Sequence, residues 1–403
     1  MIGAGVFVVF APAAAAAGTG LLIGLLVAAV VAYCNADSSA RLAALYPESG
    51  GSYVYGRRRL GPFWGYLAGW SFVVGKTASC AAMALTVGLY LWPDHAHAVA
   101  VAAVAALTAL NYRGVRKSVW LTRVIVAITV AALAGVVGVV ARSGETGPLT
   151  WGPTTWGPTT WDPTTWGPTT WGPTTVSGVL QAAGLLFFAF AGYARIATLG
   201  EEVRDPARTI PRAIPLALLL TLAVYASVAV AVLIALGPDG LARSSAPLAD
   251  AVRIAGAGWL EPVVRAAAAL AALGSLLSLI LGVSRTVLAM ARDRHLPGAL
   301  AAVHTRFGVP HRAEVAVGVV VGAVAAAADV RAAIGFSSFA VLVYYTVANA
   351  SAFTLNGRRW VPVLGVAGCV TLAVFLPAAS IAAGAAVTLA GAAVFAIGAL
   401  RSR

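Results

Sequence analysis

Long apolar runs follow one another along almost the whole chain, and this pattern limits what the chain can fold into. A helix needs about 20 mostly apolar residues to cross a bilayer. Of the 403 residues, 60% are hydrophobic and only 10% are charged, whereas soluble domains carry about 25% charged residues. A water-soluble globule is therefore excluded, and the sequence predicts an all-helical integral membrane protein.

Breaks rich in charged residues, proline or glycine separate about twelve expected transmembrane helices. We expect one transporter domain over 1–403, with five spans in 1–141, an outer loop in 142–175, five spans in 176–355 and two in 356–403. The first span is shorter than a full crossing. The expected spans are Met1–Ala17, Leu21–Leu45, Phe63–Trp92, Ala96–Leu110, Val119–Ala141, Val176–Gly200, Ala213–Leu236, Trp259–Ala291, Val315–Ala328, Ala332–Leu355, Trp360–Pro377 and Ala378–Leu400.

Basic residues concentrate in alternate loops, which predicts the orientation of the chain, because cytoplasmic loops carry an excess of Lys and Arg. We expect the richer loops and the C-terminus in the cytoplasm, and the plasma membrane as the location. The richer loops hold Arg57, Arg58, Arg59, Arg113, Arg116, Lys117, Arg204, Arg208, Arg212, Arg292, Arg294, Arg306, Arg312, Arg358, Arg359, Arg401 and Arg403. The other loops hold Arg142, Arg243, Arg253 and Arg331.

The net charge of +13 is spread between apolar runs instead of forming one patch. The lipid bilayer is therefore the expected partner, and nucleic acid is not. Three cysteines lie far apart inside apolar stretches, so no disulfide framework or metal site is expected. The sequence does not determine the oligomeric state or whether an accessory subunit is needed.

Residues 151–175 contain five copies of the pentad W-(G/D)-P-T-T. Proline in every copy excludes a sustained helix and favours an extended, polyproline-like linker. The charge pattern places this segment outside the cell. The preferred interpretation is a repeat that expanded in a loop where insertions are tolerated. The alternatives are that the Trp side chains contact the bilayer interface or bind a ligand.

Two glycine-containing stretches predict interruptions within spans. Gly3, Ala4 and Gly5 come just before a helix-compatible run, and residues 188–193 (Phe-Ala-Phe-Ala-Gly-Tyr) lie in the sixth span. Inside a bilayer, an interrupted helix leaves peptide groups that need another partner, usually a cavity or a ligand. Helix packing is the alternative for each stretch alone. At the start of two five-span halves, paired interruptions favour a midplane binding site.

Several ordered motifs resemble those of the amino acid–polyamine–organocation (APC) permeases. Ile2 to Phe7 (IGAGVF) resembles their first-span motif, and Pro47 to Tyr55 (PESGGSYVY) resembles the loop after their second span. The pair Gly69-Trp70 resembles part of their third span. Residues 187–193 (FFAFAGY) and 201–206 (EEVRDP) resemble their sixth span and its exit. Residues 285–297, which contain MARD and LP, resemble the end of their eighth span.

The resemblance implies a LeuT-like fold of two inverted five-span repeats, which works by alternating access. It implies that a substrate carboxylate meets the amides of Gly3, Ala4 and Gly5. The amino group would meet carbonyls of the sixth span. The residues implied there are Phe188, Ala189, Ala191 and Gly192, and Phe188 aligns with the aromatic residue that closes over the substrate.

The sequence departs from the family pattern at two places. The first-span motif begins directly after Met1, so we expect that a coding segment precedes Met1, with a functional truncated protein as the alternative. Many proton-coupled relatives carry a lysine in a fifth-span motif that reads Val-Ala-Ile-Lys. Here the aligned residue is Thr129, which cannot titrate.

Lys76 lies near the middle of the third span, and a lysine at that depth is a functional candidate. Structural pairing with a carbonyl or carboxylate, proton coupling or gating, and direct substrate contact are all open. If it stays charged beside the substrate, it favours neutral amino acids over cationic ones. The coupling ion is expected to be a proton. Sodium, held by the hydroxyls of Ser275 and Ser278 one helical turn apart, is the alternative.

Other charged side chains within or beside the spans are expected either to stabilise the fold or to form a gate at the inner end of the transport path. Arg195 and Arg285 could pair with Glu201 or Glu202 as an inner gate, or extend to the lipid headgroups. Asp37 and Arg41 are four residues apart in the second span, and we expect them to pair.

The sequence therefore predicts a secondary transporter of L-amino acids, neutral ones in particular, driven by proton symport. It needs no cofactor and performs no covalent chemistry. An exchanger or exporter is the first alternative. A transport-inactive sensor or partner subunit with the same fold is the second, and a membrane-embedded enzyme is disfavoured because no His/Asp/Glu constellation recurs at depth.

Overall fold

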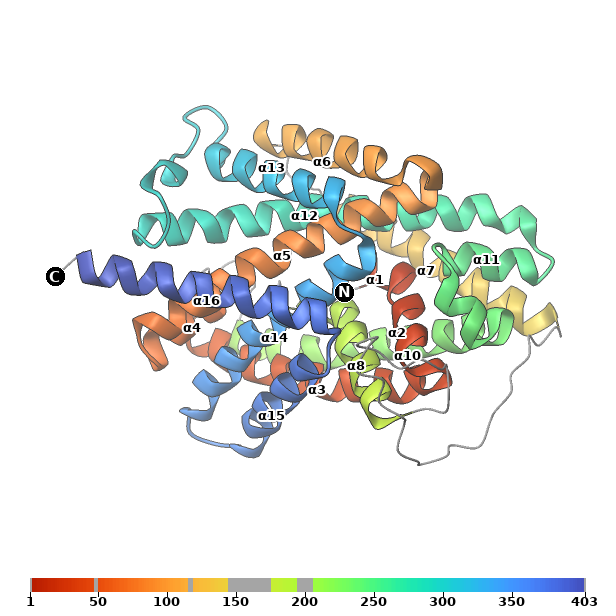
Figure 1. Cartoon of the computed structure of the whole chain (residues 1–403), viewed down its shortest axis with the longest axis horizontal. Coiled ribbons are helices and arrows are strands. Elements are labelled where there is room, and N and C mark those ends of the chain that lie inside the picture. The colour runs from red at the N-terminus through yellow and green to blue at the C-terminus, as the bar shows by residue number, and fades with distance from the viewer. Residues whose placement is uncertain (1, 47–49, 115–118, 144–174, 194–205, 402–403) are drawn as a thin grey trace, which may run out of the picture.

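The computed structural model describes residues 2–46, 50–114, 119–143, 175–193 and 206–401. All regular structure within these ranges is helical, and the long helices lie side by side along the long axis of the molecule (Figure 1). The main helices are α1 (Gly5–Val8), α2 (Phe10–Ala17), α3 (Leu21–Leu45), α4 (Ser52–Arg59), α5 (Pro62–Leu91), α6 (Ala96–Tyr112), α7 (Val119–Ser143), α8 (Val176–Phe190), α10 (Pro206–Arg243), α11 (Pro247–Ile254), α12 (Glu261–Arg292), α13 (His311–Ala327), α14 (Val330–Phe353), α15 (Trp360–Val374) and α16 (Ala378–Arg401).

Eight helical segments in the described ranges are long and apolar enough to cross a membrane, and α8 and α15 are shorter apolar helices. The chain is thus a multi-pass membrane protein. Every expected apolar run contains a helix, and the second coincides with α3. The largest differences are in the sixth and seventh runs. There α8 ends at Phe190, ten residues before Gly200, and α10 extends past Leu236 through a kink at Gly237.

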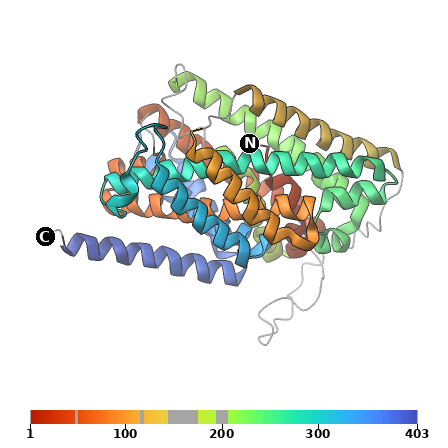
Figure 2. The same ribbon diagram turned by 90° about the horizontal axis from the view of Figure 1, so that it is seen from above.

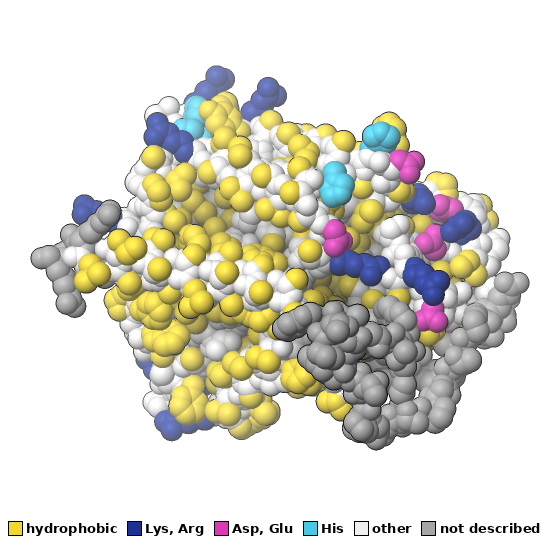
Figure 3. Space-filling model, viewed as in Figure 1, with side chains coloured by type: hydrophobic (Ala, Val, Ile, Leu, Met, Phe, Trp, Pro, Cys, Tyr) yellow, Lys and Arg dark blue, Asp and Glu magenta, His cyan; other side chains and the backbone are white. Residues whose placement is uncertain are grey.

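Two sets of loops lie at opposite ends of the helical bundle. The end that carries α4 and the C-terminus is on the left of Figure 1, and the end that carries α11 is on the right. On the face seen in Figure 3, Asp and Glu side chains lie in the right half together with several Lys or Arg side chains, and other Lys or Arg side chains lie at the left and the top. A largely hydrophobic surface lies between the left and right groups, as a bilayer around the middle of the molecule requires.

The helix α5 forms the centre of the bundle. Its most apolar window is 78% buried inside the protein, whereas that of α16 is only 11% buried. Figure 2 shows α16 along the outside of the bundle. A polar side chain on α5 is therefore surrounded by protein instead of lipid, and α5 carries Lys76.

The short helix α4, which the sequence analysis treats only as a loop, is held by hydrogen bonds and an ion pair to the residues that directly follow α12. The carboxylate of Asp293 accepts a hydrogen bond from Tyr53 Oη at 2.5 Å and pairs with Arg57 Nη1 at 2.6 Å. Tyr53 Oη also lies 2.9 Å from His295 Nδ1. Since the single phenol proton goes to Asp293, Nδ1 of His295 must carry a hydrogen and donate it to Tyr53.

Burial lowers the pKa of His295, and Arg57 lowers it further against the opposing effect of Asp293. The unfolded chain, with a histidine pKa of about 6.5, therefore binds the proton before the folded protein does. Proton binding by the unfolded chain thus lowers the free energy of unfolding. This loss is absent well above about pH 6.5 and grows as the pH falls through this value. We expect His295→Gln to reduce the loss of melting temperature between about pH 7.5 and pH 5.5. The exposed His95, changed to Gln, is the matched control, and an equal loss in all three proteins would contradict this role.

Candidate functional site

The first span is interrupted at its beginning. Gly3 precedes the helix, Ala4 caps it with helical dihedral angles, and α1 begins at Gly5. Val9, between α1 and α2, also keeps helical dihedral angles and donates to the Gly5 carbonyl. One helical hydrogen bond is missing there, because Pro12 has no N–H to donate to the carbonyl of Val8. The first amides of α1 have no partner within their own helix and carry the positive end of the helix dipole.

The second interruption comes later than the sequence predicts. Phe188 and Ala189 were expected in unwound chain, but both lie in the last turn of α8, and the α-helix gives way to a 3₁₀ turn at Ala191–Tyr193. The amide of Ala191 still donates to the carbonyls of Phe187 and Phe188. Helical hydrogen bonding thus continues to Ala191, just before Gly192, so the predicted break at Phe188 and Ala189 was placed too early. Contact of these two residues with a substrate stays a prediction.

The two interruptions touch each other. A Cβ atom added to Gly5 would lie 2.8 Å from Ala189 Cα, and one added to Gly3 would lie 2.5 Å from Ser275 Oγ. Gly5 is buried, and Ala4 and Phe188 are at most 7% exposed. The structure therefore brings residues from the first, sixth and eighth expected spans into one buried place.

Lys76 reaches this place from α5. Its side chain is 5% exposed, and Nζ donates a hydrogen bond to the carbonyl of Ala191 at 3.2 Å. Among the described residues, no carboxylate lies within ion-pair distance of it. A buried charge requires hydrogen-bonded partners, and here a backbone carbonyl of the second interruption supplies one.

Two buried tyrosines donate hydrogen bonds to backbone carbonyls close to the two interruptions, and the sequence analysis missed both. Tyr90 Oη donates to the carbonyl of Phe7 at 2.8 Å, and Tyr225 Oη donates to the carbonyl of Ala189 at 3.2 Å. A tyrosine inside an apolar span needs a partner for its hydroxyl, and this requirement was the available signal. The partner itself could not be read from the sequence.

Other predicted residues take different positions. Thr129 and Ser278 are buried, and each hydroxyl donates to a carbonyl of its own helix, from Thr129 to Ile125 at 2.7 Å and from Ser278 to Gly274 at 2.9 Å. Arg285 is exposed on α12, where its charge acts on the buried Glu314. Arg195, Glu201, Glu202 and the pentad repeats lie outside the described residues.

Comparison with known proteins decides the family. Residues 1–400 match the family described as amino acid permease. The chain belongs to this family, within the APC superfamily. The permease is 65% identical over 402 residues to an uncharacterized transporter of Mycobacterium tuberculosis strain H37Rv, an alignment that covers 98% of this chain and 88% of the relative.

More distant relatives of the permease carry names with two kinds of substrate. A branched-chain amino acid permease of Bacillus subtilis is 24% identical over 335 residues, covering 77% of this chain and 68% of the relative. Cationic amino acid transporter 7 of Arabidopsis thaliana is 27% identical over 386 residues, covering 90% of this chain and 64% of the relative.

The site of the permease offers backbone groups of both polarities. Amides at the start of α1 suit an anionic group, and carbonyls at the end of α8 suit a cationic one. The described residues contain no group of three or more His, Cys, Asp or Glu side chains placed to hold a metal ion.

Proposed function

We propose that this permease carries neutral L-amino acids across the plasma membrane by alternating access, coupled to the symport of a proton. The observation that carries the proposal is the hydrogen bond from the Lys76 ammonium to the Ala191 carbonyl. It lies at the second interruption, which touches the first through Gly5 and Ala189.

The substrate carboxylate binds at the start of α1. The amides of Gly3, Ala4 and Gly5 come before or begin the helix, and Ala4 is 1% exposed. An anion there is favoured both by hydrogen bonds from the amides and by the helix dipole. Ser275, beside Gly3, supplies a further hydroxyl. This half of the site needs no charged side chain.

The substrate ammonium binds the carbonyls at the end of α8. The carbonyl of Ala191 already accepts a hydrogen bond from one ammonium, that of Lys76, so its position suits a cationic group. The incoming amino group binds a neighbouring carbonyl of the same turn while protonated Lys76 holds that of Ala191. Lys76 therefore gates the site, because its proton and the substrate bind together and both stabilise the occluded state.

The charge of Lys76 selects neutral side chains. The α-ammonium that every amino acid brings is offset by the carboxylate of the same substrate at the start of α1. The side chain of lysine or arginine would bring a further positive charge without such an offset, and the Lys76 ammonium repels it strongly because the protein interior screens charge poorly. This argument favours the substrate class in the name of the Bacillus subtilis relative over that in the name of the Arabidopsis relative.

The proton is the coupling ion that fits Lys76. A buried lysine releases its proton more readily than an exposed one. Protonated Lys76 holds the Ala191 carbonyl, and the neutral amine loosens this contact after the site opens to the cytoplasm. Sodium at Ser275 and Ser278 is the alternative ion, since Ser278 only donates its hydrogen to the Gly274 carbonyl and keeps its oxygen lone pairs for a cation.

Uptake into proteoliposomes tests the proposal. We expect an inwardly directed proton gradient to drive accumulation of labelled leucine, with at least about a tenfold preference over lysine, which corresponds to about 1.4 kcal/mol. A sodium gradient without a pH gradient should have no effect. Preferred uptake of lysine would contradict the substrate class. Counterflow without net uptake would indicate an exchanger, and ligand-induced stabilisation without any transport would indicate a sensor.

A further inference from the structure

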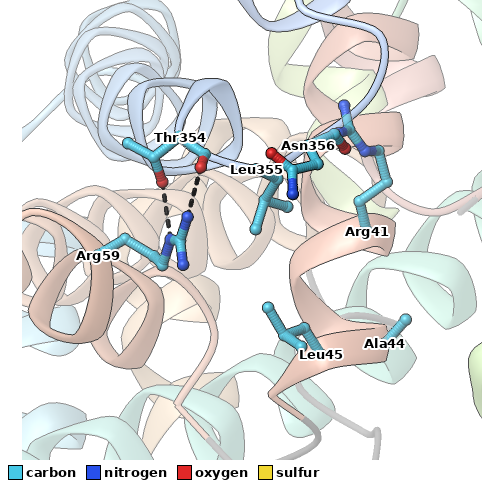
Figure 4. A pocket seen from close by; sticks show the side chains of 7 residues that line it. All are labelled: Arg41, Ala44, Leu45, Arg59, Thr354, Leu355 and Asn356. Carbon is cyan, nitrogen blue, oxygen red and sulfur yellow. Dashed lines mark hydrogen bonds between the residues drawn. The ribbon is translucent and has the colours of Figure 1, made fainter.

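A cavity of about 670 Å³ opens where α3, α4 and α14 end, away from the site described above. It is lined by residues of α3, by the last residue of α4 and by the segment that follows α14. Figure 4 shows Arg59 on one side and Arg41 on the other, with Asn356 between them and Leu45 and Ala44 below. Leu355 and Thr354 complete the lining.

Both guanidinium groups are fixed by the segment after α14. Arg59 donates from Nε to Thr354 Oγ1 at 2.7 Å and from Nη2 to the Thr354 carbonyl. Arg41 donates to the carbonyls of Arg358 at 3.0 Å and Asn356 at 3.1 Å. A guanidinium group has five N–H donors, so each retains donors beyond these bonds. Fixed guanidinium groups are suited to bind phosphate.

No described carboxylate lies within ion-pair distance of Arg41. Its guanidinium group turns to carbonyls across the cavity, and the charge of Asp37 acts on it from beyond ion-pair distance. No described carboxylate pairs with Arg59 either. The cavity therefore presents two fixed positive charges.

The same cavity has an apolar wall at the ends of two segments that are long and apolar enough to span a membrane, Phe10–Leu45 and Val330–Phe353. Leu45, in the last turn of α3, is 52% exposed, and Ala44 and Leu355 are partly exposed. Trp360, just after the loop that holds Arg41, is 58% exposed, as expected for an interfacial anchor. By the charge distribution, this end of the bundle faces the cytoplasmic leaflet, where anionic lipids are abundant.

We propose that this cavity binds the headgroup of an anionic phospholipid of the cytoplasmic leaflet. The phosphate oxygens accept hydrogen bonds from Arg41 and Arg59, and the glycerol backbone and first acyl carbons contact Leu45 and Ala44. The apolar wall favours a lipid over a free phosphate ion, which has no group to bury there. The bound headgroup joins the ends of α3 and α4 to the segment after α14.

Binding of phosphatidylglycerol to the purified full-length protein tests this site. In native mass spectrometry, we expect the protein to retain more phosphatidylglycerol than phosphatidylcholine. In thermal melting, we expect phosphatidylglycerol to raise the melting temperature more than phosphatidylcholine does. Arg41→Gln and Arg59→Gln should each weaken binding about fivefold, and Arg→Lys at each position should restore part of it. Arg58→Gln is the matched control, since it removes the same charge from the next position without touching the cavity lining.

Three results would overturn the proposal. These are equal binding of the two lipids, equal loss in the Arg58→Gln control, and equal stabilisation by inorganic phosphate or glycerol phosphate, which would make the cavity a site for soluble anions. Arg59 also bonds to Thr354, so its replacement could lower the stability of the protein itself. If a variant melts at a lower temperature in phosphatidylcholine, its lipid retention is compared with that of the parent at a temperature where both stay folded. Transport activity is not needed for this measurement.

Discussion

Gly5→Ala is expected to lower substrate uptake at least about tenfold. The added methyl group would lie 2.8 Å from Ala189 Cα and 2.9 Å from Ala189 Cβ. The nearest of these atoms is backbone and cannot rotate away, so the first and sixth spans must separate. Overpacking of this kind costs about 1–3 kcal/mol. Because the two interruptions meet at this contact, a shift there disturbs both halves of the substrate site.

Gly282→Ala is the matched control for this prediction. Gly282 lies on α12, and a Cβ atom added there meets nothing within 4 Å. Alanine at a helical position is favoured over glycine by about 1 kcal/mol, so this variant should be as stable as the parent and transport normally. Both variants are compared by leucine uptake in proteoliposomes and by thermal melting. Gly5→Ala with unchanged melting and more than half of the parent uptake would refute the close contact.

Lys76→Met is expected to abolish accumulation driven by a proton gradient while exchange of labelled for unlabelled substrate continues. Met has a similar length and no charge, so it removes the cost of burying an ammonium, although the Ala191 carbonyl loses this donor. Unchanged thermal melting and continued exchange would show that the loss of accumulation does not come from unfolding. The variant should also accept lysine better, because the repelling ammonium is gone. Uptake of leucine and lysine at several external pH values measures both effects.

Lys76→Arg separates the two roles of Lys76. Arginine keeps the positive charge but does not release its proton in proteins. We expect this variant to discriminate against lysine as the parent does and to lose accumulation driven by the proton gradient. If Lys76→Met leaves the rate and pH dependence of leucine uptake unchanged, Lys76 is a structural partner of the Ala191 carbonyl and no more.

The candidate site was predictable where it depends on backbone breaks. Gly3 and Gly5 identify the first interruption, and Gly192 marks the approximate place of the second. The position of Phe188 and Ala189 was not predictable, because a helix ends where its hydrogen bonds end, and alanine and phenylalanine are compatible with either state. The tyrosine partners Tyr90 and Tyr225 required knowledge of which helices are neighbours.

Arg41 shows the same limit for charges. Its spacing from Asp37 predicts a pair on one helix face, yet its guanidinium group binds carbonyls more than 300 positions away in the sequence. Local spacing gives the partners that a side chain could reach on its own helix. It gives no information about competing acceptors that another helix brings to the same place.

The sequence by itself determined the membrane class, the approximate limits of the helices and the segregation of basic loops, because each follows from the hydropathy and charge of consecutive residues. The family resemblance was likewise carried by short local motifs. Only the tertiary structure decided that Gly5 contacts Ala189, that Lys76 bonds to Ala191 and that Arg41 and Arg59 share one cavity. These contacts join residues far apart in the chain, and they depend on how whole helices pack against one another.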